Sequence, residues 1–276
     1  MRLSTLLRAG AVVTASALTL GLSTVPASAH ESTLGRPASA AAVDHPGARL
    51  ATSSDLHVRA SARASRSASS TAADVVQLKA SSAVLFNPEE NYIDVDVYLV
   101  DPEEQVDGIT LDLSIGGHTV GPLDLYYDED EDVTFVVVPG NVGLGKAQFT
   151  GTTIQYTEES GLPDDQDTTA SNAFFVRRAI VSATPAATYS VKGKRKRFYV
   201  HQVGIYTPSV GDFTSLRTIK LQYNKNGTWR TKKNIKLNSS GNGSYSFKSS
   251  KKYRYRIYSG TTATSTGFRT SQSKKL

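Results

Sequence analysis

The sequence predicts an all-β protein built from two β-sandwich domains. Short runs in which apolar and polar residues alternate recur along the chain, and segments rich in glycine, proline, aspartate or asparagine separate them. No segment sustains the 3.6-residue apolar period of a packed helix. With 276 residues, the chain is long enough for two domains.

Residues 1–29 are predicted to be a secretory signal peptide. They combine a basic start at Arg2 and Arg8, an apolar run over 9–22 and a small-residue cleavage pattern over 27–29. A permanent membrane anchor needs about 20 continuous apolar residues, and this run is shorter and contains threonine, serine and glycine. We therefore expect a secreted or surface-associated protein whose mature chain has no transmembrane segment.

Residues 30–73 are predicted to be a disordered linker rich in alanine and serine. They hold twelve alanines and nine serines, and no aromatic residue, isoleucine or methionine. Such a segment cannot bury enough apolar surface to offset the entropy lost on ordering it. Whether it is a pro-segment is left open.

Residues 74–182 are predicted to form the first sandwich, which is acidic. Between 93 and 99, four aliphatic residues alternate with Asp94, Asp96 and Tyr98, which places the aliphatic side chains on one face of a strand. The further strand candidates in this domain are 109–115, 119–127, 133–138, 146–157 and 173–178.

Residues 189–276 are predicted to form the second sandwich, which is basic. Asn226-Gly227 is the strongest hairpin signal, and 241–243 is a second turn. Tyr253 and Tyr255 fall on the same face as Ile257, so we expect them in the core. The expected strands begin near Tyr189 and include 198–206, 219–223, 235–237, 245–247 and 253–257.

The second domain resembles a known class of module. The resemblance rests on the Asn-Gly turn before Trp229, the Gly-Asn-Gly turn, the run Tyr-Arg-Tyr-Arg-Ile over 253–257 and a small-residue hairpin after it. Over 189–270, these features resemble the Ig-like modules of proteins exported by Gram-positive bacteria, and both domain lengths fit the Ig-like size. The resemblance implies tandem Ig-like β-sandwiches with an adhesion, binding or spacer role.

The charges are divided unevenly along the chain. Residues 74–188 hold 4 basic and 21 acidic residues, a balance of −17. Residues 189–276 hold 20 basic residues and one acid, Asp212, a balance of +19. Because an average surface mixes both signs, a domain with this excess repels itself and attracts an opposite field.

Three interpretations of this asymmetry stay open. The preferred one is that the basic domain binds an anionic envelope polymer by charge, without sequence-specific recognition of nucleic acid. The second is that it docks on the acidic domain of the same or another copy, as a clasp or a self-assembly contact. The third is that both surfaces are merely solvated. The predicted anion-binding residues are Lys192, Lys194, Arg195, Lys196, Arg197, Lys251, Lys252, Arg254 and Arg256.

Calcium is a weaker prediction for the acidic domain, and no other cofactor is expected. Oxygen-rich clusters suit calcium, but the run 128–132 departs from an EF-hand loop because Val133 stands where glycine is required. The calcium candidates are Asp101, Glu103, Asp107, Asp128, Asp130 and Asp132.

We expect the protein not to be an enzyme. The chain contains no cysteine, which excludes thiol nucleophiles and thiolate metal sites. It also has no Gly-x-Ser-x-Gly motif and no phosphate-binding glycine motif. No nucleophile with a partner base can therefore be named.

Overall fold

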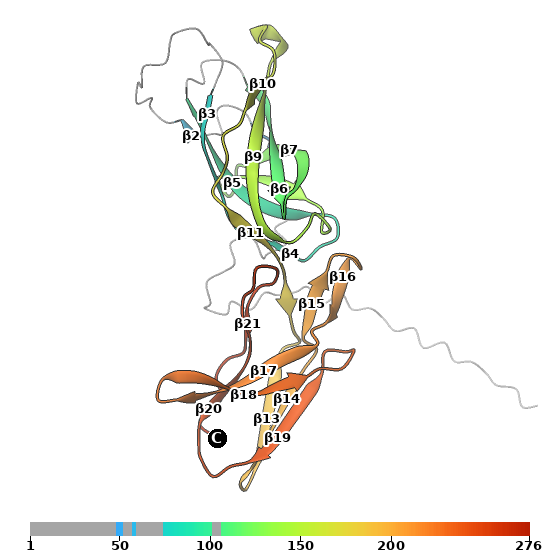
Figure 1. Ribbon diagram of the computed structural model, residues 1–276, viewed down its shortest axis with the longest axis vertical. Coiled ribbons are helices and arrows are strands. Elements are labelled where there is room, and N and C mark those ends of the chain that lie inside the picture. The colour runs from blue at the N-terminus through green and yellow to red at the C-terminus, as the bar shows by residue number, and fades with distance from the viewer. Residues whose placement is uncertain (1–47, 52–56, 59–73, 101–105) are drawn as a thin grey trace, which may run out of the picture. The chain divides into compact units, whose positions relative to one another are not determined.

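The computed structural model describes residues 48–51, 57–58, 74–100 and 106–276 (Figure 1). These residues form β-strands joined by turns and loops, with one described 3-10 helix, η2 (Glu158–Ser160). The predicted all-β class is confirmed. The described part of the chain contains no helix with the length and apolar character needed to cross a membrane. The predicted signal peptide lies outside the described residues.

The first group of strands forms an 11-stranded sheet in the order β2-β5-β8-β7-β6-β9-β11-β4, with β1 paired to β7, β3 to β5 and β10 to β9. The strands of this sheet enclose one core, and β5 pairs with β2, β3 and β8. The strands are β1 (Arg49–Leu50), β2 (His57–Val58), β3 (Asp74–Ala80), β4 (Ala83–Leu85), β5 (Asn91–Val100), β6 (Val106–Ile115), β7 (His118–Asp128), β8 (Val133–Val138), β9 (Gly145–Tyr156), β10 (Asp165–Asp167) and β11 (Phe174–Arg178).

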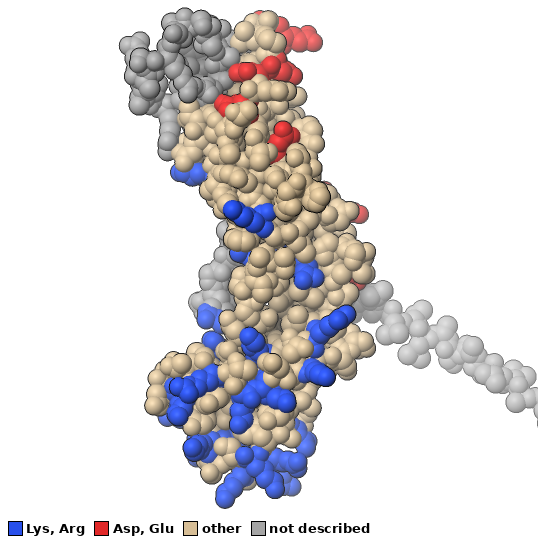
Figure 2. Space-filling model, in the orientation of Figure 1, with Lys and Arg blue, Asp and Glu red and all other residues tan. Residues whose placement is uncertain are grey.

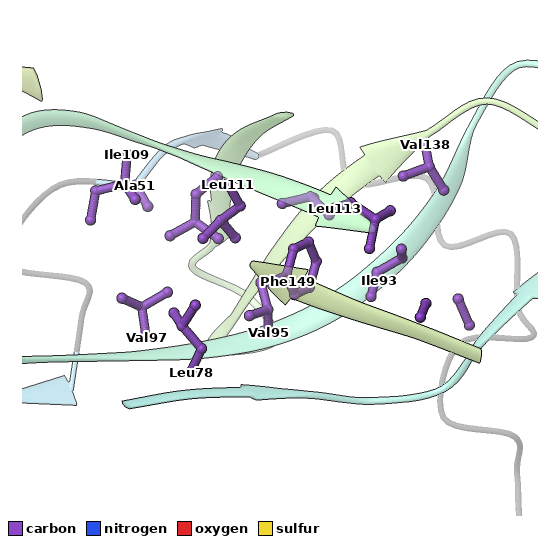
Figure 3. Packing of buried hydrophobic residues seen from close by; sticks show 14 of the residues in the cluster. Ala51, Leu78, Ile93, Val95, Val97, Ile109, Leu111, Leu113, Val138 and Phe149 are labelled. Carbon is purple, nitrogen blue, oxygen red and sulfur yellow. The ribbon is translucent and has the colours of Figure 1, made fainter. Parts of the chain in front are cut away.

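The alternation of aliphatic and other residues along β5 explains why this segment forms a strand. Its alternate aliphatic residues at 93, 95, 97 and 99 are all 0% exposed, while the residues between them are half-buried. Successive side chains of a strand point to opposite faces, so one face of β5 enters the core. Figure 3 shows Val95 and Val97 facing Leu111 and Leu113 of β6, with Phe149 of β9 among them.

Part of the predicted linker is ordered. Within 30–73, Arg49–Leu50 pairs with β7 and His57–Val58 pairs with β5. Ala51 is fully buried in the first core. The expectation of disorder is therefore wrong for these residues, because long-range pairing supplies the contacts that their composition lacks. The remainder of 30–73 lies outside the described residues.

The second group of strands forms three sheets, in the orders β12-β15-β16, β13-β14-β19 and β18-β17-β20-β21. The strands are β12 (Ile180–Val181), β13 (Ala187–Lys192), β14 (Arg195–Val200), β15 (Gly204–Thr207), β16 (Asp212–Ser215), β17 (Thr218–Lys225), β18 (Thr228–Lys236), β19 (Gly243–Lys248), β20 (Arg254–Ser259) and β21 (Phe268–Arg269).

The sheets β13-β14-β19 and β18-β17-β20-β21 pack face to face around a second core. Phe198 of β14 lies with its ring centre 4.9 Å from that of Tyr255 of β20. Ile257 is buried in the same core, and Tyr253 is half-buried against it. The core position predicted for the two tyrosines is therefore confirmed, and the arrangement is a β-sandwich.

In this second group of strands, one sequence-based prediction is confirmed and another is wrong. Asn226 and Gly227 have φ of 52° and 84°, as a two-residue type I′ hairpin requires. The single strand predicted over 198–206 is wrong. The chain breaks between β14 and β15, where Gln202 has φ of 47°, and the second piece joins another sheet.

Tyr206 of β15 lies beyond the boundary expected between the two domains, but it packs in the first core. It is fully buried, and its hydroxyl has no hydrogen-bond partner among the described residues. Its ring lies edge-on to that of Phe213 on the paired strand β16, with centres 5.7 Å apart. The first core therefore includes a residue that follows the acidic segment in the sequence.

Candidate anion-binding surface

A row of three cations crosses the sheet β13-β14-β19. Lys192 pairs with Arg195, and Arg195 pairs with Lys248. Residues directly opposite each other in neighbouring strands point to the same face, and all three side chains are exposed. Like charges in this position repel, so the row costs stability unless an anion lies over it.

Two loops add further cations beside this row. The carbonyl of Lys194 accepts a hydrogen bond from the N–H of Ser249 at 2.8 Å, and the N–H of Lys251 donates to the Ser249 hydroxyl at 3.2 Å. These bonds bring the turn before β14 next to the loop after β19. The exposed residues Lys192, Lys194, Arg195, Lys248, Lys251 and Lys252 are called the basic end below.

Lysine and arginine side chains gather over the part of the chain that holds β13 to β20 (Figure 2). Arg197 lies on the same face of β14 as Arg195 and is exposed. Its Nη1 donates to the Tyr199 hydroxyl at 3.0 Å, which directs the guanidinium along the sheet surface. Arg197 therefore flanks the basic end.

Lys196 does not belong to this surface, which corrects the sequence-based prediction. Its side chain is 2% exposed and points into the second core. The ammonium donates to the carbonyl of Lys251 and lies 5.7 Å from the centre of the Tyr255 ring. Burial lowers the pKa of Lys196, and the charges of Lys252 and Lys232 lower it further. This lysine is therefore not available to an external anion.

Arg254 and Arg256 were predicted as anion-binding residues together with Lys251 and Lys252. The structure separates them, because β20 begins at Arg254 and the two lysines lie in the preceding loop. The two arginines alternate with the buried residues of β20, so they lie on the outer face of the other sheet.

Arg256 is engaged within the protein. Its Nε donates to Oε1 of Gln222 at 2.9 Å, and its guanidinium lies 4.2 Å from the centre of the Trp229 ring and 4.9 Å from that of Tyr258. Burial, followed by the charge of Arg269, lowers its pKa. Arg256 therefore orders this sheet face and is not a free contact for a ligand.

Three cations in or near the basic end are not among the predicted anion-binding residues: Lys248, Lys232 and Lys233. Lys248 follows the core residue Phe247, so strict alternation predicts that it points outward. Lys232 and Lys233 of β18 reach over to β19, where their ammonium groups lie 4.8 Å from the Phe247 ring centre and 5.9 Å from that of Tyr245. Only the tertiary structure brings this pair to β19.

The acidic candidates for calcium do not come together in the described residues. Asp101 and Glu103 lie outside those residues, and Asp107 is exposed on β6. The remaining candidates are Asp128 at the end of β7 and Asp130 and Asp132 in the turn that follows it. Among the residues that the structure describes, no three histidine, aspartate or glutamate side chains form a group that could hold a metal ion. Calcium binding stays a prediction.

The acidic side chains around the β7–β8 turn accept hydrogen bonds from within the turn. Oδ1 of Asp128 accepts the N–H of Asp130 at 2.9 Å and that of Glu131 at 3.3 Å, and the Tyr127 hydroxyl donates to Asp132 at 2.9 Å. Aspartate side chains that accept backbone N–H groups two and three residues on stabilise turns. These contacts shape the turn between β7 and β8.

The sequence matches no protein-family model and no curated protein. Among solved structures, the chain is similar to FdeC, an adhesin of Escherichia coli, at 14% identity and a TM-score of 0.26, with 72% of this chain and 65% of that chain covered. It is also similar to a β-glucuronidase of Parabacteroides merdae at 11% identity and a TM-score of 0.20, with 72% and 25% covered. The chain thus spans less than two thirds of either protein. Similarity this slight assigns no family or activity, and it does not support the expected relation to Gram-positive modules.

Proposed function

We propose that this chain is an exported, non-enzymatic binding protein of the cell surface, whose basic Ig-like domain contacts anionic polymers by charge. The observation that carries the proposal is the basic end, where six exposed cations come together from β13, β14, β19 and two loops. Their own domain offers little compensating charge, since Asp212 is the one acid within 189–276.

The chemistry of the basic end favours a flexible polyanion over a small ligand. Its cations are exposed on a sheet face and on neighbouring loops, so their charges add over an extended surface. A phosphate- or carboxylate-bearing chain that lies across them releases its condensed counterions, and this release drives binding with little dependence on monomer sequence. It also relieves the repulsion along the row of Lys192, Arg195 and Lys248.

Sedimentation of the full chain with poly(glycerol phosphate), at a series of salt concentrations, tests this proposal. Neutral dextran serves as the control polymer. We expect binding to poly(glycerol phosphate) that weakens steeply with salt, and no binding to dextran. Replacing Lys192, Arg195 and Lys248 together by serine should reduce the slope of log affinity against log salt by about two.

A charge-matched variant controls for net charge. Replacing Arg217, Lys220 and Lys236 by serine also removes three exposed cations, but from the region of the other sheet. The proposal predicts a smaller loss for this variant. Equal losses would mean that only total charge matters, and the basic end would not be the site.

The unaltered full chain also serves to test the alternative function, in which the acidic and basic domains contact each other. If the chain ignores the polymer and instead associates with itself in a salt-sensitive manner, the charge asymmetry serves assembly. Analytical ultracentrifugation of the full chain without polymer, at low and high salt, measures this directly.

A further inference from the structure

Strand β13 lies at the edge of its sheet. In the order β13-β14-β19, the described part of the chain pairs β13 with β14 alone. The opposite edge differs, because β19 lies beside β18 and the ammonium of Lys232 covers the Phe247 ring. The sandwich is therefore closed on the side of β19 and open on the side of β13.

The register shows which backbone groups of β13 point to the open side. The N–H of His201 donates to the carbonyl of Ala186 at 2.9 Å, which makes this a hydrogen-bonded pair. Hydrogen-bonded pairs alternate along an antiparallel ladder, so residues 188, 190 and 192 also bond to β14. The N–H and C=O groups of Ala187, Tyr189 and Val191 are consequently directed to the free edge.

The pairing of β14 with β19 supports this assignment independently. The N–H of Ser249 donates to the carbonyl of Lys194 at 2.8 Å, so even-numbered residues of β14 bond to β19. Odd-numbered residues of β14 are then left to bond to β13, as the first assignment requires.

Two apolar side chains on the core-facing side of β13 are uncovered. Tyr189 lies opposite the buried Phe198, and Val191 lies opposite the buried Lys196, so both point to the core side of the sheet. They are nevertheless 40% and 46% exposed. A further strand beside β13, with apolar residues at alternate positions, would cover them.

The other face of the edge is positive. Thr188, Ser190 and Lys192 point outward from β13, and Arg195 and Arg197 lie behind them on β14. An added strand would place its outward side chains beside these residues. Acidic side chains match this field, and basic ones would be repelled.

We infer that the free edge of β13 binds an extended acidic peptide as an added β-strand. The apolar side chains of the peptide cover Tyr189 and Val191, its acidic side chains face Lys192 and Arg197, and its backbone pairs with Tyr189 and Val191. This mode of recognition takes affinity from the ladder and specificity from the alternating side chains. A second β13 is a poor occupant, because it would bring two basic edges together.

Binding of the full chain to the peptide acetyl-(Val-Glu)4-amide tests this inference. Two comparison peptides separate pattern from charge: (Val-Val-Glu-Glu)2 has the same composition without strict alternation, and (Val-Lys)4 has the opposite charge. We expect the alternating acidic peptide to bind tightest and the lysine peptide not to bind. On binding, the amides of Tyr189 and Val191 should gain protection from hydrogen exchange.

A pair of variants tests the backbone contact. Val191→Pro and Val191→Ala both remove apolar contact, but only proline also removes the outward N–H, and proline is tolerated on edge strands. We expect about a threefold loss of affinity for V191A and a further loss of about tenfold for V191P. Equal affinities of the two variants, at unchanged circular dichroism, would overturn the inference.

Peptides N-methylated at alternate valines repeat this test on the unaltered chain, so it does not depend on the folding of V191P. Equal binding of methylated and unmethylated peptides would exclude strand pairing, as would equal binding of the alternating and blocked peptides. The proposed polymer contact is judged separately, because V191P should bind poly(glycerol phosphate) as the unaltered chain does.

Discussion

The ammonium group of Lys196 lies 5.7 Å from the centre of the Tyr255 ring, inside the core of the second sandwich. The two side chains are 2% and 3% exposed. Burial disfavours the charged form of each, so the pKa of the lysine is lowered and that of the tyrosine is raised to about 12. Their effects on stability therefore oppose each other as the pH rises.

Lys196→Met should change how stability depends on pH below 10. The folded protein gives up the proton of Lys196 at a lower pH than the unfolded chain, whose lysine pKa is 10.5. Below the pKa that Lys196 has in the folded protein, the full cost of burying its charge destabilises the fold. Between that pKa and 10.5 this cost decreases as the pH rises, so Lys196 makes the free energy of unfolding increase over this pH range. Urea unfolding between pH 7 and pH 10 should show the rise in the unaltered chain and a smaller rise in K196M. The exposed Lys192→Met is the control; a rise of the same size in K196M would contradict the assignment.

Tyr255→Phe should improve stability in strong alkali. The raised pKa means that the folded state keeps the phenol neutral, so its contribution is complete below pH 10.0 and is lost as the pH rises to about 12. The loss amounts to at most about 3 kcal/mol. Urea unfolding at pH 9 and pH 11.5 should show a smaller decline for Y255F than for the unaltered chain. The exposed Tyr189→Phe should leave the decline as it is, and a Y255F decline equal to that of the unaltered chain would refute the prediction.

Tyr206→Phe should stabilise the protein. The hydroxyl is buried without a hydrogen-bond partner among the described residues and lies against Gly140. An unpaired buried hydroxyl loses its hydration, so removing it should raise the free energy of unfolding by about 1 kcal/mol. Chemical unfolding at neutral pH measures this. A clear destabilisation by Y206F would show that the hydroxyl is paired.

Asn91→Ala should be among the most damaging single substitutions in the first sandwich. The fully buried amide accepts the N–H groups of Phe86 at 2.8 Å and Asn87 at 3.2 Å, and it donates to the carbonyl of Asn87 at 2.7 Å. Its removal leaves several backbone groups unpaired, at a cost of about 3 kcal/mol or more. The exposed Asn234→Ala should stay within about 0.5 kcal/mol. Thermal unfolding of both variants checks the difference, and a cost for N91A close to that of N234A would contradict it.

Sequence patterns predicted the long strands of the first domain. The alternating strand β5 and the strands β6, β7 and β9 differ from their predictions by a few residues at the ends, and β8, which is buried at consecutive positions, coincides with the predicted 133–138. Alternation in the sequence did not reveal β4, because its residues 83–85 are all buried and therefore do not alternate between apolar and polar. The pairing of Arg49 with Tyr127 depends on contacts across 78 positions, which local patterns do not contain.

Only part of the candidate site could be predicted from the sequence, because local patterns do not show which distant residues meet. Counting charges located the basic domain but treated every cation alike. Strict alternation along β14 places Lys196 on the same face as Phe198, which identifies it as an inward residue. The meeting of Lys194 with the loop after β19 required the fold, because the residues are far apart in the sequence and joined by sheet pairing.

The uniform charge beside the open edge of β13 also has a consequence for the behaviour of the protein in solution. An unpaired edge with uncovered apolar side chains is a starting point for aggregation, and natural proteins often protect such edges with lysine. At about 0.1 M salt, where charges act over about 10 Å, Lys192, Arg195 and Arg197 hold the edges of two copies apart. In about 1 M salt this range falls to about 3 Å, and the same edges can meet. Concentrated salt should thus make the chain prone to precipitate, and the cations of the basic end also act as solubilising groups for the fold that carries them.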